Sequence, residues 1–183
     1  MGRYKNSGLA HGTKGSPQKK FDNYELEIKV KLLEKQILNE KKQKEKEIED
    51  LEKANVKFNK ENVIFVVRDK TEQFIWLEKG NSFAGLHHIM YGDGKHSKGH
   101  IEDFKNKHKI LKEDLVDHIK MIISKGIVEY SKIRLKNGKP GLEKLYKFNY
   151  CYMIAAIRLN GFLVSAYPIE SNEAKKLIKE NRE

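Results

Sequence analysis

The sequence has little cysteine and no long apolar run, and each shortage excludes a class of protein. Cys151 is the one cysteine among 183 residues, so the chain can form no internal disulfide framework and no thiolate-rich zinc or iron–sulfur site. No window approaches the ~18–20 consecutive apolar residues that a membrane span needs. Residues 1–20 also lack the apolar stretch of a secretory signal peptide. We therefore expect a soluble chain that is made in the cytoplasm and has no membrane partner.

Acidic residues are outnumbered by basic ones. The chain has 37 Lys and Arg against 26 Asp and Glu, which gives a formal net charge of +11. A surplus of this size favours a polyanionic partner such as nucleic acid. Apolar residues are also scarce: 38% of the chain is hydrophobic and 34% is charged, so we expect the core to cover only part of the chain.

The N-terminal part of the chain is predicted to extend from a single domain. Residues 1–20 combine five cations with Gly, Ser and Asn and carry no acid, which is typical of a disordered basic arm. Residues 21–58 have no Gly or Pro and predict a long charged amphipathic helix. Apolar residues recur there at spacings of four and three: Leu26, Val30, Leu33 and Ile37. Two interpretations stay open: this helix forms a homo-oligomer, or it packs one face on its own domain.

The remaining residues predict an α+β fold, with helices packed on an antiparallel β-sheet behind the long helix. The β-branched run at 63–67 and the apolar run at 74–77 predict a hairpin. Asn81 or Ser82 would cap a short helix over residues 83–90, and a later helix is expected at 111–125. Further strands are expected at 127–135, 145–149, 150–159 and 162–168. Residues 59–170 would form this domain, and 171–183 a short helix or tail.

Four of the seven histidines fall between His87 and His100, in a stretch rich in Gly and Lys. Imidazole changes protonation near neutral pH, so two of them can act as general base and general acid in phosphodiester cleavage without a metal. Lys95 and Lys98 would neutralise the scissile phosphate. Two alternatives stay open: His96 and His100 bind a metal ion, or the histidines only contact phosphate or decorate the loop.

We expect no metal and no cofactor, because the neighbouring glycines disfavour the helix that would bring His96 and His100 together. His118 lies beside apolar neighbours in a predicted helix and is expected to be a structural histidine. His108 lies between two lysines and is expected to be solvated.

The last predicted hairpin carries polar side chains on one face. Strand residues alternate between faces, so Ser165 and Tyr167 share one side, while Val164 and Ala166 share the other. Arg158 lies on the preceding strand, and its guanidinium would suit a phosphate. The alternative is an ordinary amphipathic edge strand whose hydroxyls have no chemical role.

Two segments of the chain resemble a known family. The first is Gly85-Leu86-His87-His88-Ile89, and the second is the closing strand Gly161-Phe162-Leu163-Val164-Ser165-Ala166-Tyr167-Pro168. Together they are similar to the phage and polymorphic-toxin branch of the barnase, EndoU, colicin-nuclease and RelE-like (BECR) superfamily. The resemblance covers roughly residues 61–170. It implies a metal-independent endoribonuclease.

The resemblance also implies which residues act. It places a catalytic histidine on the short helix, where His88 fits best and His87 is the rival. It assigns the strand pair of hydroxyls to Ser165 and Tyr167. For the second acid–base group the order is His96 first and His100 second, because the glycine-rich loop departs from the family pattern.

The sequence therefore predicts a small basic endoribonuclease of phage or toxin type that cleaves RNA to a 2′,3′-cyclic phosphate. The resemblance favours tRNA as the target class. An active toxin needs a neutralising partner, so we expect an acidic immunity or antitoxin protein. The protein would act in the cytoplasm of a bacterial or phage-infected cell, or after delivery to a target cell. The alternative is a non-catalytic nucleic-acid-binding or phage assembly protein whose histidines have no catalytic role.

Overall fold

The computed structural model describes residues 17–95, 98–136 and 138–181. Contacts within the chain divide it into two units, residues 1–43 and residues 44–183. Helix α1 (Pro17–Lys53) begins in the first unit and ends in the second. The strands of the second unit are β1 (Val63–Arg68), β2 (Phe74–Glu78), β3 (Ile127–Lys136), β4 (Lys139–Phe148), β5 (Cys151–Arg158) and β6 (Leu163–Ile169). Its helices are α2 (Leu86–Tyr91), α3 (Ile101–His108), α4 (Leu115–Lys125), α5 (Ser171–Glu180) and the 3₁₀ turn Lys60–Asn62.

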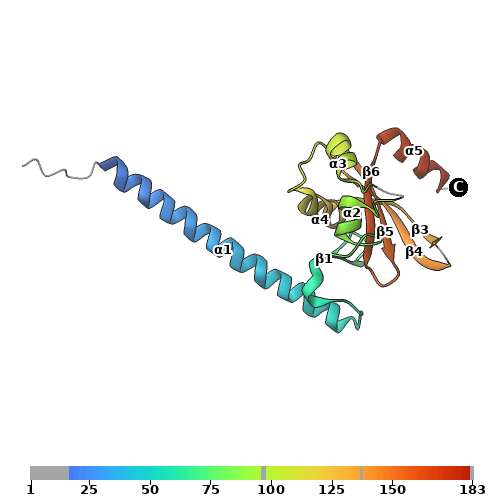
Figure 1. Ribbon diagram of the computed structural model, residues 1–183, viewed down its shortest axis with the longest axis horizontal. Helices are drawn as coiled ribbons and strands as arrows, with labels where there is room; N and C mark the ends of the chain where they lie inside the picture. The colour runs from blue at the N-terminus through green and yellow to red at the C-terminus, as the bar shows by residue number, and fades with distance from the viewer. Residues whose placement is uncertain (1–16, 96–97, 137, 182–183) are drawn as a thin grey trace, which may run out of the picture. The chain divides into compact units, whose positions relative to one another are not determined.

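The strands form two antiparallel sheets, which confirms the predicted α+β class (Figure 1). β1 and β2 pair as the expected hairpin, with Val66 opposite Trp76. The other four strands form a meander in the order β3-β4-β5-β6. A parallel bridge between Trp76 and Phe162 joins the hairpin to the start of β6. Strand β4 begins at Lys139 rather than at the predicted Leu145, because the β3–β4 ladder already starts beside the turn.

Helix α1 ends at Lys53, before the predicted Phe58. A Schellman motif ends it: Asn55 has a positive φ of 54°, and the N–H of Val56 donates to the carbonyl of Leu51. A left-handed residue turns the chain away from the helix axis, so residues 54–58 do not continue the helix. At its other end α1 begins inside the predicted basic arm, since proline suits the first helical position. The rest of that arm, residues 1–16, lies outside the described residues.

The apolar stripe of α1 is exposed in the first unit. Its members are 47–60% exposed: Leu26, Val30, Leu33 and Ile37. In the second unit the last turns of the helix behave differently, because Ile48 and Leu51 are buried against β1 and β2. Among the described helices, α1 included, none combines the length and the apolar composition that crossing a bilayer requires.

Helix α2 begins at Leu86, and its N-cap is Gly85 rather than the predicted Asn81 or Ser82. The side chain of Asn81 closes a tight turn ahead of the helix instead. Gly85 has a φ of 82°, and its N–H donates to the carbonyl of Val164 at 3.0 Å. The start of α2 is therefore fixed against the edge of β6.

The sequence does not predict helix α3, because Phe104 is its one buried residue and most of the others are charged or polar. The next helix, α4, begins at Leu115 rather than at the predicted Leu111. Leu111 is 58% exposed and lies in the turn that precedes the helix, so it is not part of the apolar face.

The main core lies between α4 and one face of the four-stranded sheet. From the helix it takes Leu115, Ile119, Ile122 and Ile123. From the sheet it takes Tyr146, Met153, Ala155, Ile157 and Ala166. Helix α5 covers apolar residues on the opposite face, through Ala174, Leu177 and Ile178. Figure 1 shows α2, α3 and α4 on one side of this sheet and α5 away from them.

A buried ion pair joins the β1–β2 turn to the core face of β4. The Nζ of Lys144, a side chain that is only 4% exposed, lies 2.5 Å from Asp69 Oδ2. The hydroxyl of Tyr146 donates to the same carboxylate oxygen at 2.8 Å, and Thr71 donates to the other oxygen. Burial raises the pKa of Asp69, but the hydrogen bonds from Lys144, Thr71 and Tyr146 outweigh it and hold the pKa below its ordinary value.

We expect Asp69→Asn to lower the free energy of unfolding by about 3–5 kcal/mol, because it leaves the Lys144 ammonium buried without a counter-charge. Adding Lys144→Met should restore much of the loss, since the double variant buries no unpaired charge. Urea unfolding of the three proteins measures both changes. Equal losses in the single and double variants would contradict this account.

The same pair predicts a pH dependence. Because the pKa of Asp69 is lower in the folded than in the unfolded protein, the carboxylate stabilises the fold fully above its ordinary pKa of 3.8. That contribution is lost as the pH falls below this value. The difference in stability between the wild type and Asp69→Asn should therefore shrink in acid, as measured by urea unfolding at a series of pH values.

The exposed stripe of α1 predicts that the chain self-associates through this helix. We expect sedimentation equilibrium to show a dimer or a higher oligomer. Leu33→Asp should shift the equilibrium toward monomer, because the substitution places a charge in the apolar stripe of α1. Gln36→Asp adds the same charge at an exposed polar position and serves as the matched control. A wild-type chain that stays monomeric at high concentration would exclude this interpretation.

Candidate active site on the outer face of the sheet

Polar side chains gather on the face of the four-stranded sheet that turns away from α4. Paired residues of an antiparallel sheet point to the same side, so the strand register places these side chains in neighbouring rows. One row is Lys132, Glu143, Ala156 and Ser165. The next row is Tyr130, Leu145, Ile154 and Tyr167. We call this surface the outer face; helix α5 covers its apolar part.

Glu143 is at the centre of the outer face, and its side chain is only 5% exposed. Three donors surround the carboxylate: Arg134 Nη1 lies 2.8 Å from Oε2, the Tyr130 hydroxyl 3.1 Å from Oε1, and Lys132 Nζ 3.4 Å from Oε1. The Arg134 side chain is 59% exposed. A fixed carboxylate therefore lies beneath cations that reach solvent, an arrangement that suits a general base below a phosphate-binding rim.

Two tyrosines flank this carboxylate. Burial raises the pKa of Tyr130, and the charge and hydrogen bond of Glu143 raise it further. Burial also raises the pKa of Tyr167, again with a contribution from the charge of Glu143, while Arg134 opposes the shift. Both phenols are therefore protonated at neutral pH and can donate hydrogen bonds. Ser165, with 9% of its surface exposed, lies on the same face as Tyr167, as the alternation along the strand predicts.

Among the described histidines, His100 is the one whose ring contacts Tyr167. Its ring lies 5.2 Å from the ring of Tyr167, centroid to centroid, with the planes tilted by 33°. Its Nδ1 lies 3.1 Å from Asp103 Oδ2, so the carboxylate orients the ring and leaves Nε2 to act. The residue forms the N-cap of α3, and its backbone N–H donates to the carbonyl of Ile89. The sequence predicts His100 as the second candidate, after His96, for the second acid–base group.

His88 and His87 lie on α2, beside β6, but they are held differently. His88 Nδ1 lies 2.8 Å from the carbonyl oxygen of Ser82, and because a carbonyl only accepts, Nδ1 carries the proton and Nε2 is the basic nitrogen. His87 is exposed, and its ring centroid lies 5.3 Å from that of Tyr91 with the planes tilted by 59°. Among the described residues, no hydrogen bond or ring contact joins either histidine to Ser165 or Tyr167.

The segment between α2 and α3 carries exposed cations. Lys95 and Lys98 are both exposed, and the backbone N–H of Lys95 donates to the side chain of Asp93. His96 lies outside the described residues, so its predicted role stays a prediction.

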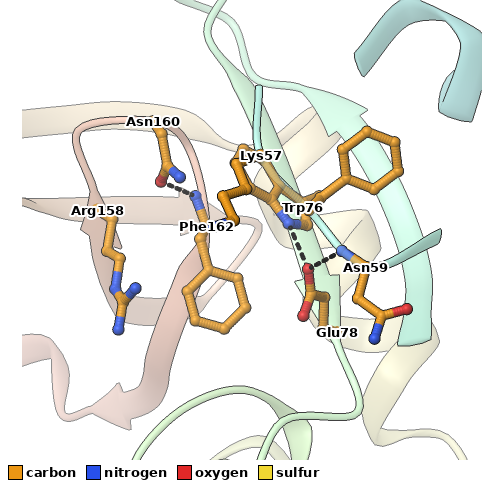
Figure 2. Close-up of a pocket in the computed structure, with 8 residues that line it drawn as sticks. Lys57, Asn59, Trp76, Glu78, Arg158, Asn160 and Phe162 are labelled. Atoms are coloured by element: carbon orange, nitrogen blue, oxygen red, sulfur yellow. Dashed lines mark hydrogen bonds between the residues drawn. The ribbon is translucent and has the colours of Figure 1, made fainter. Parts of the chain in front are cut away.

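Arg158 ends β5, beside the β5–β6 turn. Its guanidinium is 5.3 Å from the ring centroid of Phe162, and the strand register aligns it with Gly141 and Arg134. Arg158 lines an open depression of about 340 Å³, whose lining side chains are drawn in Figure 2. The lining residues are Lys57, Phe58, Asn59, Trp76, Glu78, Arg158, Asn160 and Phe162. In it, Glu78 accepts hydrogen bonds from the Trp76 indole and the Asn59 backbone.

The expectation that His108 is solvated is wrong. His108 closes α3, and its Nδ1 lies 2.8 Å from His118 Nε2, while its Nε2 lies 3.1 Å from the carbonyl oxygen of Tyr152. Burial, with the nearby His118, lowers the pKa of His108 to about 4. Burial also lowers the pKa of His118, which is structural as expected. The two lysines that flank His108 predicted a solvated side chain, but the imidazole ring turns inward and contacts α4 and β5.

Sequence reasoning missed Glu143 and its partners Tyr130 and Arg134. Glu143 precedes the predicted strand at 145–149, whereas the structure has it within β4. One signal was available: Tyr130, Lys132 and Arg134 alternate with other residues along a predicted strand and so share a face. Two cations and a phenol on one strand face suit an anionic partner or an anionic ligand.

No family model matches the chain, and no curated protein is significantly similar to it. The resemblance to the BECR superfamily therefore stays a prediction.

The hydrogen bond between Tyr130 and Glu143 predicts that Glu143 affects the ionisation of Tyr130. Removing the charge in Glu143→Gln should lower the pKa of Tyr130, because a neighbouring carboxylate disfavours the phenolate. The tyrosine Cζ resonance, followed by NMR against pH, measures this pKa. Glu129→Gln, a change on the same strand, is the comparison, and an unchanged Tyr130 titration in Glu143→Gln would contradict the arrangement.

Proposed function

We propose that the chain is a metal-independent endoribonuclease whose active site is the outer face. One observation carries the proposal: a buried carboxylate, Glu143, is held among Arg134, Lys132 and Tyr130 on the same face as Ser165 and Tyr167. His100, with its ring oriented by Asp103, contacts that face at Tyr167. A base, an acid and a cationic rim are the groups that this cleavage needs.

The reaction is transfer of the phosphoryl group to the neighbouring 2′-oxygen of RNA. The 2′-OH attacks the adjacent phosphorus and gives its proton to the general base, and the bond from phosphorus to the 5′-oxygen breaks. The leaving 5′-oxygen takes a proton from the general acid. The products are a 2′,3′-cyclic phosphate and a 5′-hydroxyl. Glu143 is the base and His100 the acid in this proposal, with His88 as the second candidate for the acid.

Cations and hydroxyls would stabilise the charge that develops on the phosphate. Arg134 and Lys132 lie on Glu143 in the free protein, and a bound phosphate would compete for the exposed Arg134 guanidinium. Tyr167 and Ser165 would donate hydrogen bonds to the non-bridging oxygens. Lys95, Lys98 and Arg158 would hold phosphates further along the strand, since all three are exposed.

RNA is the proposed partner, and the net charge of +11 supports it. The proposal keeps tRNA as the target class, because the resemblance favours it. It keeps an acidic neutralising protein as the second partner, because an active toxin needs one. The second candidate function is RNA or DNA binding without catalysis. The exposed apolar stripe of α1 favours that candidate, since it suits a protein that assembles through its helix.

The proposal predicts cleavage of total bacterial RNA by the purified chain in EDTA, with 2′,3′-cyclic phosphate ends. Glu143→Gln and His100→Ala should each lower the rate by about 10²–10⁴-fold, as loss of a general base or acid does. Glu113→Gln, an exposed carboxylate between α3 and α4, is the matched control and should leave the rate unchanged.

Circular dichroism of each variant shows whether its fold is intact. Intact RNA with the wild-type chain, together with a gel shift that weakens steeply with salt, would replace the nuclease by the binding function. Cleavage that persists in His100→Ala but is lost in His88→Ala would move the acid to α2.

A further inference from the structure

Three side chains from different elements lie close together, outside the outer face. Each carries an atom that can ligate a transition metal. His108 comes from the end of α3, His118 from α4 and Cys151 from the start of β5. One imidazole nitrogen of each histidine and the Cys151 sulfur all lie within 4.8 Å of one another. Nothing in the proposed cleavage uses any of the three.

The hydrogen bonds show which nitrogens are available. The carbonyl of Tyr152 only accepts, so the Nε2 of His108 carries the proton and its Nδ1 presents a lone pair. This Nδ1 faces His118 Nε2 at 2.8 Å. A hydrogen bond from a ligand histidine to a backbone carbonyl is the usual outer contact of a metal site, because it fixes the tautomer and the ring orientation.

The two histidine nitrogens need only a small adjustment to fit a metal. With zinc bonds of about 2.0–2.1 Å to nitrogen and about 2.3 Å to sulfur, tetrahedral ligand atoms lie roughly 3.3–3.6 Å apart. The two nitrogens, at 2.8 Å, would separate by about half an ångström. His108 and Cys151 are both partly exposed, so a water can complete the fourth position.

We propose that His108, His118 and Cys151 form a binding site for Zn²⁺ that ties α3 and α4 to the first residue of β5. Two imidazoles and one thiolate are soft and borderline ligands that suit Zn²⁺ and exclude Mg²⁺ and Ca²⁺. On binding, the Cys151 thiol loses its proton to solvent, and the proton between the two histidines moves to His118 Nδ1. The site stands apart from the proposed ribonuclease activity, since none of the ligands lies on the outer face.

Co²⁺ titration of the full reduced chain, free of any affinity tag, tests this site. We expect one equivalent of Co²⁺ to give the intense visible bands of four-coordinate cobalt and a thiolate-to-cobalt charge-transfer band in the near ultraviolet. Zn²⁺ should displace the cobalt and abolish both. Cys151→Ser should remove the charge-transfer band, and His118→Gln should weaken affinity on the order of 100-fold or more.

The wild-type spectrum decides the question even where a variant fails to fold. A pale six-coordinate spectrum, absence of binding, or a spectrum that Cys151→Ser leaves unchanged would each overturn the proposal. RNA cleavage is measured separately, so failure of the metal site leaves the ribonuclease test intact.

Discussion

The buried ion pair between Lys144 and Asp69 is the interaction on which the second unit depends. An ammonium on the core face of a central strand is tolerated only if a carboxylate reaches it, and Asp69 does so from the turn between β1 and β2. That requirement fixes the hairpin against the sheet and closes the core on that side. Tyr146 and Thr71 complete the shell, so each oxygen of the carboxylate has a donor.

The neighbouring residue on the same strand has the opposite fate. Successive strand residues point to opposite faces, so Lys144 enters the core while Glu143 lies on the outer face. Both charges are nearly inaccessible to water, but only Glu143 is surrounded by side chains that extend into solvent. One face of the sheet thus buries its charge in the main core, and the other holds its charge beside side chains that reach solvent.

Local patterns predicted the class of fold, the β1–β2 hairpin and the last hairpin, because the apolar runs and turn residues there are strong and local. They did not predict α3, whose single buried residue gives no periodicity, or the end of α1, which depends on one left-handed asparagine. Even less of the candidate site could be predicted from the sequence. Ser165 and Tyr167 follow from strand alternation, but Glu143 and the inward turn of His108 depend on pairing between distant segments, which no local window contains.

Helix α3 separates two histidines whose surroundings differ. His100 precedes its first turn and contacts Tyr167, whereas His108 ends it and contacts His118. Eight residues of helix make a stiff spacer about 12 Å long. Each residue added or removed would rotate one end against the other by about 100°. The two contacts can therefore coexist only at one length and one angular phase of this helix, so they depend on the number of residues between the two histidines.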